Sequence, residues 1–302
     1  MNIDFTSDLH TSFIYQRNKT IFGKNGVLKQ KNDYLIVAGD INEDIEILKK
    51  SLDDIIENTT YKKIIITFGN HDIWTHQKDA IFGITNSIEK YSFLKDYFHN
   101  YREKIHVIDV EDCILKDENI IITGNMGWYN YTINQIDKSY LEKYFDANFD
   151  KMKFGITSYN DRVYIDFGEY FKNNIDFANF LEQELIERLE KIQNNPEYKT
   201  YDIFSISHIK PCNQLEKKSP FFKEYSCEKW EEIIKETGNI IGKYNLENIY
   251  GNAFFLNNHL HEIYKKYGVK YVIYGHTHFV GRSYIDGIEY ISNALGYYGM
   301  KN

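Results

Sequence analysis

Tyr271-Val-Ile-Tyr-Gly-His-Thr-His278 is the stretch that decides the fold, because it joins an apolar run to a glycine and two histidines. The apolar run from Tyr271 to Tyr274 predicts a buried strand. Gly275 lets the backbone turn tightly or approach another group closely. His276 and His278 follow that strand, and neutral imidazoles are common ligands of transition metals. Two polar residues in an ordinary loop would give the same pattern, so a metal site needs partners elsewhere in the chain.

Four other apolar runs in the chain also end in residues that bind metals or phosphates. Open α/β sheets build their sites just past the carboxyl ends of the strands, and each run places its polar residues there. We therefore expect five strand ends to converge on one site. The four runs are Ile3-Asp-Phe-Thr-Ser-Asp8-Leu-His10, Tyr34-Leu-Ile-Val-Ala-Gly39-Asp40, Lys63-Ile-Ile-Ile-Thr-Phe-Gly69-Asn70-His71-Asp72 and Asp202-Ile-Phe-Ser-Ile-Ser-His208.

The ordered series Asp-x-His, Gly-Asp, Gly-Asn-His-Asp, His and Gly-His-x-His resembles the calcineurin-like metallophosphoesterases. The motif blocks span the chain from Asp8 to His278. The resemblance implies an α/β fold, a layered α-β-β-α sandwich with two central mixed β-sheets flanked by helices, here with helical and aromatic insertions. We expect one domain over residues 1–302, with residues 130–200 as an insertion or cap.

The resemblance also implies a site for two divalent metal ions. One ion would be held by Asp8, His10, Asp40 and His278, and the other by Asp40, Asn70, His208 and His276. Asp40 would bridge the ions, and a hydroxide shared between them would attack the phosphorus. Oxygen and nitrogen donors without thiolate suit several metals. Mn²⁺ is the first choice, with Fe, Zn, Ni or Co as alternatives.

Two further residues of the same motifs are expected to act in catalysis. By resemblance, His71 donates a hydrogen bond to the phosphoryl oxygen or protonates the leaving oxygen. Asp72 would fix the tautomer of the His71 ring and keep the ring protonated. Candidate substrate contacts are Asn70, His71, His76 and Arg282, the last because a guanidinium matches phosphate oxygens.

Each candidate also has a structural interpretation. Asp8, Asp40 and Asn70 are residue types that favour turns and helix caps after strands, and a lone histidine such as His208 is often a core or loop residue. His259 and His261 lie two apart on a predicted helix over 257–267, so they are expected to be surface histidines. Only the joint pattern favours the metal site.

The spacing of apolar residues predicts the remaining elements. Strands are expected over 3–7, 34–38, 64–68, 105–108 and 120–123. Residues 11–32 are expected to form a loop over the site. Helices are expected after Asp40, over about 78–100, along a stripe from Phe177 to Leu189, and before a strand at Lys270. A second insertion is expected over 209–256, and Asp286-Gly287 between two apolar runs predicts a hairpin.

Composition narrows the class of partner. The net charge of −8 does not favour nucleic acid as a ligand, so we expect a small phosphorylated substrate or a phosphoprotein. No apolar run is long enough to cross a membrane, the first residues do not predict a signal peptide, and three unpatterned cysteines are typical of reduced thiols. These features predict a cytoplasmic protein that binds no membrane, and they leave the oligomeric state open.

The leading function is hydrolysis of a phosphate monoester or diester. Three alternatives remain: a DNA nuclease of the same superfamily, a non-catalytic metal-binding scaffold protein, and a sensor that binds a phosphorylated ligand without hydrolysing it. Metal-dependent turnover of a small ester separates the leading function from the scaffold and the sensor, whereas the nuclease predicts cleavage of single-stranded DNA and a tight dimer or partner subunit.

Overall fold

The computed structural model describes residues 2–131, 153–154, 157–158, 160–215 and 254–299. Its first sheet has four strands in the order β1-β2-β3-β4. All neighbouring strands in it are parallel, so of the two sheets expected to be mixed, this one is purely parallel. The strands are β1 (Ile3–Thr6), β2 (Tyr34–Ala38), β3 (Lys63–Thr67) and β4 (Ile105–Val107).

The second sheet has six strands in the order β11-β12-β10-β9-β6-β5. Its four inner strands are parallel, whereas β11 and β5 pair antiparallel at its two edges. The strands are β5 (Cys113–Leu115), β6 (Ile120–Gly124), β9 (Asp202–Ser207), β10 (Tyr271–Tyr274), β11 (Val280–Ile285) and β12 (Ile288–Asn293).

The predicted hairpin is confirmed as β11 and β12. Asp286 and Gly287 connect the strands with φ values of 50° and 86°. A two-residue turn with two positive φ angles matches the right-handed twist of the flanking strands, which explains why Asp-Gly occupies it.

The core between the two sheets takes alternate residues from the strands of the first sheet. In β2, Ile36 and Ala38 face the second sheet, where they pack near Ile206 of β9. Leu35 and Val37 point the opposite way, into the layer beneath the helices. Every residue of β2 is therefore buried, as its continuous apolar run predicted.

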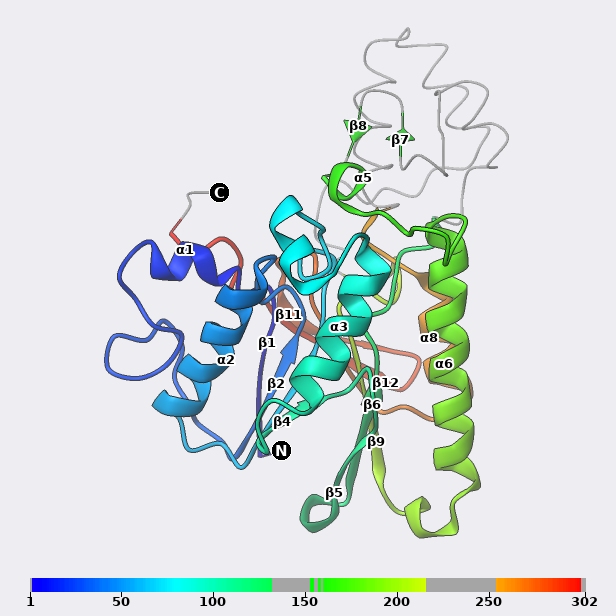
Figure 1. Ribbon diagram of the computed structural model, residues 1–302. Coiled ribbons are helices and arrows are strands. Elements are labelled where there is room, and N and C mark those ends of the chain that lie inside the picture. Colours follow the sequence, from blue (N-terminus) through cyan, green and yellow to red (C-terminus); the bar gives the residue numbers. More distant parts are fainter. Residues whose placement is uncertain (1, 132–152, 155–156, 159, 216–253, 300–302) are drawn as a thin grey trace, which may run out of the picture.

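The outer face of the first sheet is covered by α2 (Ile45–Asn58) and α3 (Ser87–His99). Leu48 and Leu52 of α2 and Leu94 of α3 belong to one apolar cluster with the strand residues. The helix α2 begins at Asp44, whose carboxylate accepts hydrogen bonds from the backbone N–H groups of the first turn. In Figure 1, the strands lie between α2 on one side and α6 on the other.

The outer face of the second sheet is covered by α6 (Asn174–Asn194) and α8 (Asn258–Lys266). Leu185 of α6 and Tyr264 of α8 pack with Val272 of β10 in a separate apolar cluster. The layers therefore run helix, sheet, sheet, helix, which confirms the predicted fold class.

Two local predictions were wrong, and two short elements were missed. The segment expected to be one helix over 78–100 is divided into η1 (Gln77–Phe82) and α3, because Gly83 ends the first at a φ of 75°. The expected loop over 11–32 begins with the short helix α1 (Thr11–Tyr15). The edge strand β5 and the short 3₁₀ turn η2 (Lys116–Glu118) that follows it were not predicted.

The expected insertion over 130–200 contains α6 and several short elements. These are β7 (Lys153–Phe154), β8 (Thr157–Ser158), α5 (Asp161–Tyr164) and η3 (Pro196–Tyr198). The helix α6 packs on the second sheet, so this part of the segment contributes to the scaffold. The division into one domain with an insertion stays a prediction, and most of the second expected insertion, residues 216–253 of 209–256, lies outside the described residues.

Candidate metal centre

The five predicted strand ends meet at one edge of the two sheets. Within the first sheet, Asp8 N donates to Gly39 O at 3.0 Å. Within the second, Gly275 N donates to His208 O at 3.0 Å. The sheets are joined where His276 N donates to Asp8 Oδ1 at 2.9 Å. These hydrogen bonds, two between backbone groups and one to the Asp8 carboxylate, connect the loops that follow β1, β2, β9 and β10.

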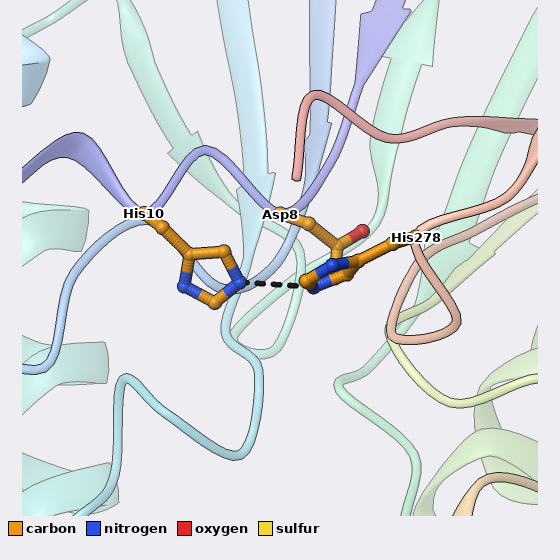
Figure 2. Close-up of side chains that lie close together, drawn as sticks. All are labelled: Asp8, His10 and His278. Carbon is orange, nitrogen blue, oxygen red and sulfur yellow. Dashed lines mark hydrogen bonds and ion pairs between the residues drawn. The ribbon is translucent and has the colours of Figure 1, made fainter. Parts of the chain in front are cut away.

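Asp8, His10 and His278 form the first group of candidate ligands. One ligand atom from each lies within 4.8 Å of the others. The two Nε2 atoms of His10 and His278 are 3.1 Å apart, and His278 Nε2 is 3.6 Å from Asp8 Oδ1. In Figure 2, the two imidazoles point toward one another, with Asp8 beside His278.

Asp40, His208 and His276 form the second group, and their ligand atoms also lie within 4.8 Å of one another. Asn70 joins them, because its Oδ1 is 3.0 Å from His276 Nδ1 and 3.1 Å from His208 Nε2. The four side chains come from the ends of β2, β3, β9 and β10. This is the set that the resemblance assigned to the second ion.

Asp40 lies between the two groups. Its Oδ1 is 3.3 Å from His208 Nε2, whereas its Oδ2 is 3.8 Å from His10 Nε2. One carboxylate oxygen therefore faces each group. The side chain is 2% exposed, so the two oxygens are placed by the fold and not by solvent.

Hydrogen bonds to backbone carbonyls determine which ring nitrogen of two histidines faces away from the candidate ligands. His208 Nδ1 is 2.9 Å from Ala38 O, and His276 Nε2 is 2.8 Å from Phe254 O. A carbonyl only accepts, so these nitrogens carry the protons. His208 Nε2 and His276 Nδ1 are then left to face Asn70 and Asp40, which is how metal-binding histidines are usually oriented.

Burial and charge both favour a cation in this site. Burial lowers the pKa of His10 and of His276 to about 3, so both rings are neutral. Burial also opposes ionisation of Asp40, but His208 and His71 hold the pKa of its carboxyl well below the usual value. Burial alone would lower the pKa of His208, yet attraction to Asp40 raises it to about 9.

Among the described residues, no lysine or arginine pairs with Asp8 or Asp40. The convergent oxygen and nitrogen donors therefore fit divalent metal ions.

The backbone of this site is strained. A positive φ is uncommon outside glycine, and such strain collects at functional sites. The described part of the chain has nine non-glycine residues with a positive φ, of which five are candidate ligands: Asp8, His10, Asp40, His276 and His278.

His71 lies at the edge of the site, where its side chain is 19% exposed. Its Nε2 is 4.0 Å from Asp40 Oδ2, and its backbone N donates to Asp40 Oδ1 at 3.0 Å. The ring stacks on Trp74, with centroids 3.7 Å apart. The imidazole is therefore held beside the candidate ligands and is partly exposed.

The structure does not support contact between Asp72 and the His71 ring, so this prediction is corrected. Asp72 accepts hydrogen bonds from Gly69 N at 2.7 Å and Asn42 N at 2.8 Å. The carboxylate is fully buried. It joins the loop after β3 to the loop after β2, since backbone amides in both loops need an acceptor.

The two remaining predicted substrate contacts lie at different places. His76 is at the start of η1, with its Nε2 3.6 Å from Glu43 Oε2 and its ring 5.0 Å from that of Tyr164. Because Tyr164 stacks on Trp74, His76 is joined to the His71 side of the site through aromatic rings. Arg282 donates to Glu289 at 2.8 Å on the β11–β12 hairpin, and among the described residues it makes no hydrogen bond or ion pair to a candidate ligand.

His261 corrects another prediction. Its side chain is 6% exposed, whereas that of His259 is 55% exposed. His261 Nδ1 lies 2.6 Å from the Tyr290 hydroxyl, so it is a buried residue of the core under β12. The spacing of two residues placed His259 and His261 on different faces of the helix, but it did not show which of the two faces the sheet.

Sequence reasoning missed two residues beside the site. Tyr297 stacks on His10, with centroids 4.5 Å apart, and meets His278 edge-on at 4.7 Å. Asp161 accepts a hydrogen bond from the side chain of Asn70 at 2.8 Å. Neither belongs to a motif, and both are distant in the chain from the residues they touch, so no local pattern identified them.

Comparison with known proteins agrees with the fold. A family model of calcineurin-like phosphoesterases matches residues 1–280. Uncharacterized protein L509 of Acanthamoeba polyphaga mimivirus is 25% identical over 313 residues, which cover 99% of this chain and 92% of the viral protein. The crystal structure of a phosphopantetheinyl hydrolase from Mycobacterium tuberculosis has a TM-score of 0.68 at 16% identity, covering 98% of this chain and 89% of that chain. At this identity it is similar in fold alone.

The chain belongs to the calcineurin-like phosphoesterase family. It is a hydrolase of phosphate esters that depends on metal. Its candidate metal ligands lie in three overlapping groups of converging donors, the two described above and a third formed by His10, Asp40 and His71. In the described part of the chain, no helix is both long enough and apolar enough to span a membrane.

Proposed function

We propose that this protein hydrolyses a phosphate monoester or diester with two divalent metal ions held side by side. The observation that carries the proposal is the position of Asp40, which presents one oxygen to each of two groups of donors. A carboxylate shared in this way is typical of sites with two metals. When bound, the ions would activate water and neutralise charge on the phosphoryl oxygens.

The residues of the chain then have separate tasks. Asp8, His10 and His278 hold one ion with Asp40, and Asn70, His208 and His276 hold the other with the same carboxylate. His71 binds no ion in this scheme. Its stacking on Trp74 and its partial exposure support a role as a donor to the phosphoryl or leaving oxygen.

We propose Mn²⁺ as the first metal to test and a small phosphorylated molecule or phosphoprotein as the substrate. Support comes from the donor set, which lacks thiolate, and from the net charge of −8, which does not favour nucleic acid. A phosphopantetheinyl ester is one small substrate to include, because the structural neighbour is described as a phosphopantetheinyl hydrolase. A cytoplasmic site of action remains a proposal.

The test compares p-nitrophenyl phosphate with bis-p-nitrophenyl phosphate after chelation and addition of Mn²⁺, Ni²⁺ or Zn²⁺. We expect metal-dependent turnover, with the preferred ester deciding between a phosphatase and a phosphodiesterase.

Asp40→Asn should abolish turnover and reduce metal content, because both ions lose a shared anion. Asp202→Asn, at an exposed partner of Lys270, is the control. Full activity of Asp40→Asn would contradict the scheme of two metals, and cleavage of single-stranded DNA would favour the nuclease.

A further inference from the structure

Asp161, the first residue of α5, is a buried carboxylate beside the site that no motif includes. It is 2% exposed. Its Oδ1 accepts from Asn70 Nδ2 at 2.8 Å and from Trp74 Nε1 at 2.6 Å, and its Oδ2 accepts from the Tyr129 hydroxyl at 3.1 Å. Within the described residues, no lysine or arginine pairs with it, so three neutral donors satisfy this carboxylate.

The contact with Asn70 determines which end of the amide faces the metal site. The Asn70 atom beside Asp161 Oδ1 is Nδ2, and an amide NH₂ group only donates hydrogen bonds. The amide oxygen is therefore directed toward His276 Nδ1 and His208 Nε2, at 3.0 and 3.1 Å. Without Asp161, the amide could rotate and present its NH₂ group, which cannot bind a cation.

The contact with Trp74 acts on the other side of the site. The indole N–H is the only polar group of the Trp74 side chain, and Asp161 accepts its hydrogen bond. The indole face in turn stacks on the His71 ring, with centroids 3.7 Å apart and planes inclined by 27°. One carboxylate thus fixes the support on which His71 rests.

The helix α5 is itself attached to the loop after β3. Thr75 N donates to Tyr164 O at 2.9 Å, and the Tyr164 ring stacks on Trp74 at 4.8 Å. Asp161 therefore reaches the site on a backbone that is joined to the same loop as Asn70 and Trp74. This explains how a residue 91 positions from Asn70 holds a defined distance to it.

We propose that Asp161 is a positioning residue for both halves of the reaction site, orienting the Asn70 oxygen toward the second ion and the His71 ring toward the substrate. The proposal rests on the proposed function, because it assigns Asn70 to an ion and His71 to the phosphoryl group. It also gives part of the segment over 130–200 a defined task in the site.

The test uses Asp161→Ala and the milder Asp161→Asn, with Mn²⁺ binding measured by metal analysis and by electron paramagnetic resonance. We expect Asp161→Ala to bind one ion as the wild type does and to bind the second about 10- to 100-fold more weakly. The signal of a coupled pair of Mn²⁺ ions should change to that of a single ion. kcat should fall by a similar factor, with less change in KM. In Asp161→Asn an amide oxygen can still accept from Asn70, so this variant should recover part of both losses.

Asp109 offers a matched control for the loss of a buried carboxylate. It is 5% exposed and accepts from Thr67 Oγ1, the Tyr91 hydroxyl and Met126 N at 2.6 to 2.8 Å, but it touches no candidate ligand. Asp109→Ala and Asp109→Asn should lower the thermal midpoint of the chelated protein while leaving binding of both ions unchanged. If the Asp109 variants lose the second ion to the same extent, the effect is structural and the proposal fails.

Three outcomes separate this proposal from the proposed function. The proposed function and the positioning role are both supported if the wild-type protein binds two ions and hydrolyses the ester, and if the Asp161→Ala variant loses only the second ion. Two ions and normal kcat in Asp161→Ala and Asp161→Asn would overturn the positioning role alone. Wild-type protein that binds a single ion would overturn the proposed function, and with it the role of Asp161. If Asp161→Ala does not fold, Asp161→Asn decides by the same measurements.

Discussion

His10 and His278 are 268 positions apart in the chain, yet their Nε2 atoms lie 3.1 Å from one another. The first follows β1 of the parallel sheet, and the second follows β10 of the other sheet. The two sheets meet where β1 and β12 lie side by side, and Asn293 Nδ2 donates to Phe5 O there at 2.8 Å. The contact between the sheets thus forms one half of the candidate metal centre.

Replacing His278 should therefore remove one ion and leave the other. In His278→Ala, the first group keeps only Asp8, His10 and the shared Asp40, whereas the second group is untouched. We expect the Mn²⁺ content to fall from two ions to one, and kcat to fall by more than about 100-fold because a metal ion contributes several kcal/mol to such reactions. Metal analysis after gel filtration measures the content.

His259→Ala is the control for His278→Ala, because His259 is exposed on α8. It should keep both ions and full activity. Loss of both ions from His278→Ala would show that the two groups do not bind independently. Retention of both would remove His278 from the candidate ligands.

Most of the scaffold could be predicted from the sequence because its signals are local. Continuous apolar runs gave the inner parallel strands, and Asp286-Gly287 gave the hairpin. Helices with a clear apolar stripe, such as α2, were also evident. The split between η1 and α3 was missed, because the stripe continued across Gly83 while the backbone there turned to a positive φ.

The grouping of the site residues could be predicted, but the contacts of several residues could not. The ordered motifs placed Asp8, Asp40 and His278 together, since parallel strand ends share an edge. Asp161 could not be found, because its partners Asn70 and Trp74 are set by tertiary packing. Asp72 was assigned to the neighbouring His71, whereas the buried amides of Gly69 and Asn42 take both its oxygens.

Gly69→Ala should damage the metal centre through steric overlap. A Cβ at this position would overlap the Asp40 carboxylate and would come within 2.8 Å of His208 Cε1. We expect weaker Mn²⁺ binding and a loss of about 1–3 kcal/mol in the free energy of unfolding. Isothermal titration and denaturant unfolding measure the two effects.

The comparison for Gly69→Ala is Gly268→Ala. Gly268 has a φ of 68° and open space where a Cβ would lie, so alanine there costs about 1–2 kcal/mol of backbone strain without touching the site. Its Mn²⁺ affinity should equal that of the wild type. Equal affinities in both variants would show that the close approach of Gly69 to Asp40 is not needed.

His71→Ala should separate catalysis from metal binding. His71 lies beside the ligands but belongs to neither ion in the proposed scheme, so both ions should remain. We expect kcat to fall about 100- to 10,000-fold, as is usual when a general acid is lost, with the larger effect on esters that have a poor leaving group. Steady-state kinetics on two aryl esters of different leaving-group pKa, beside His259→Ala, measure this. An unchanged rate on the poorer leaving group would eliminate the acid role.

The charge of His208 makes the stability of the metal-free protein depend on pH. Burial would lower the pKa of this ring, but Asp40 raises it to about 9 in the folded protein, compared with about 6.5 in an unfolded chain. A histidine with a raised folded pKa stabilises the protein fully below pH 6.5, and this contribution is lost as the pH rises toward 9.

We therefore expect the free energy of unfolding of the chelated protein to fall between pH 6.5 and pH 9. The free energy of unfolding of the protein loaded with Mn²⁺ should fall much less, because a cation replaces the proton on His208 Nε2. Denaturant unfolding at several pH values measures the free energy of unfolding of the chelated and the Mn²⁺-loaded protein.

The control variant is Asp40→Asn, measured in the chelated form. Without the Asp40 charge, burial dominates and the His208 ring should be neutral throughout this range, so the slope should disappear. A slope that persists in Asp40→Asn would mean that the charge pair of Asp40 and His208 does not cause it.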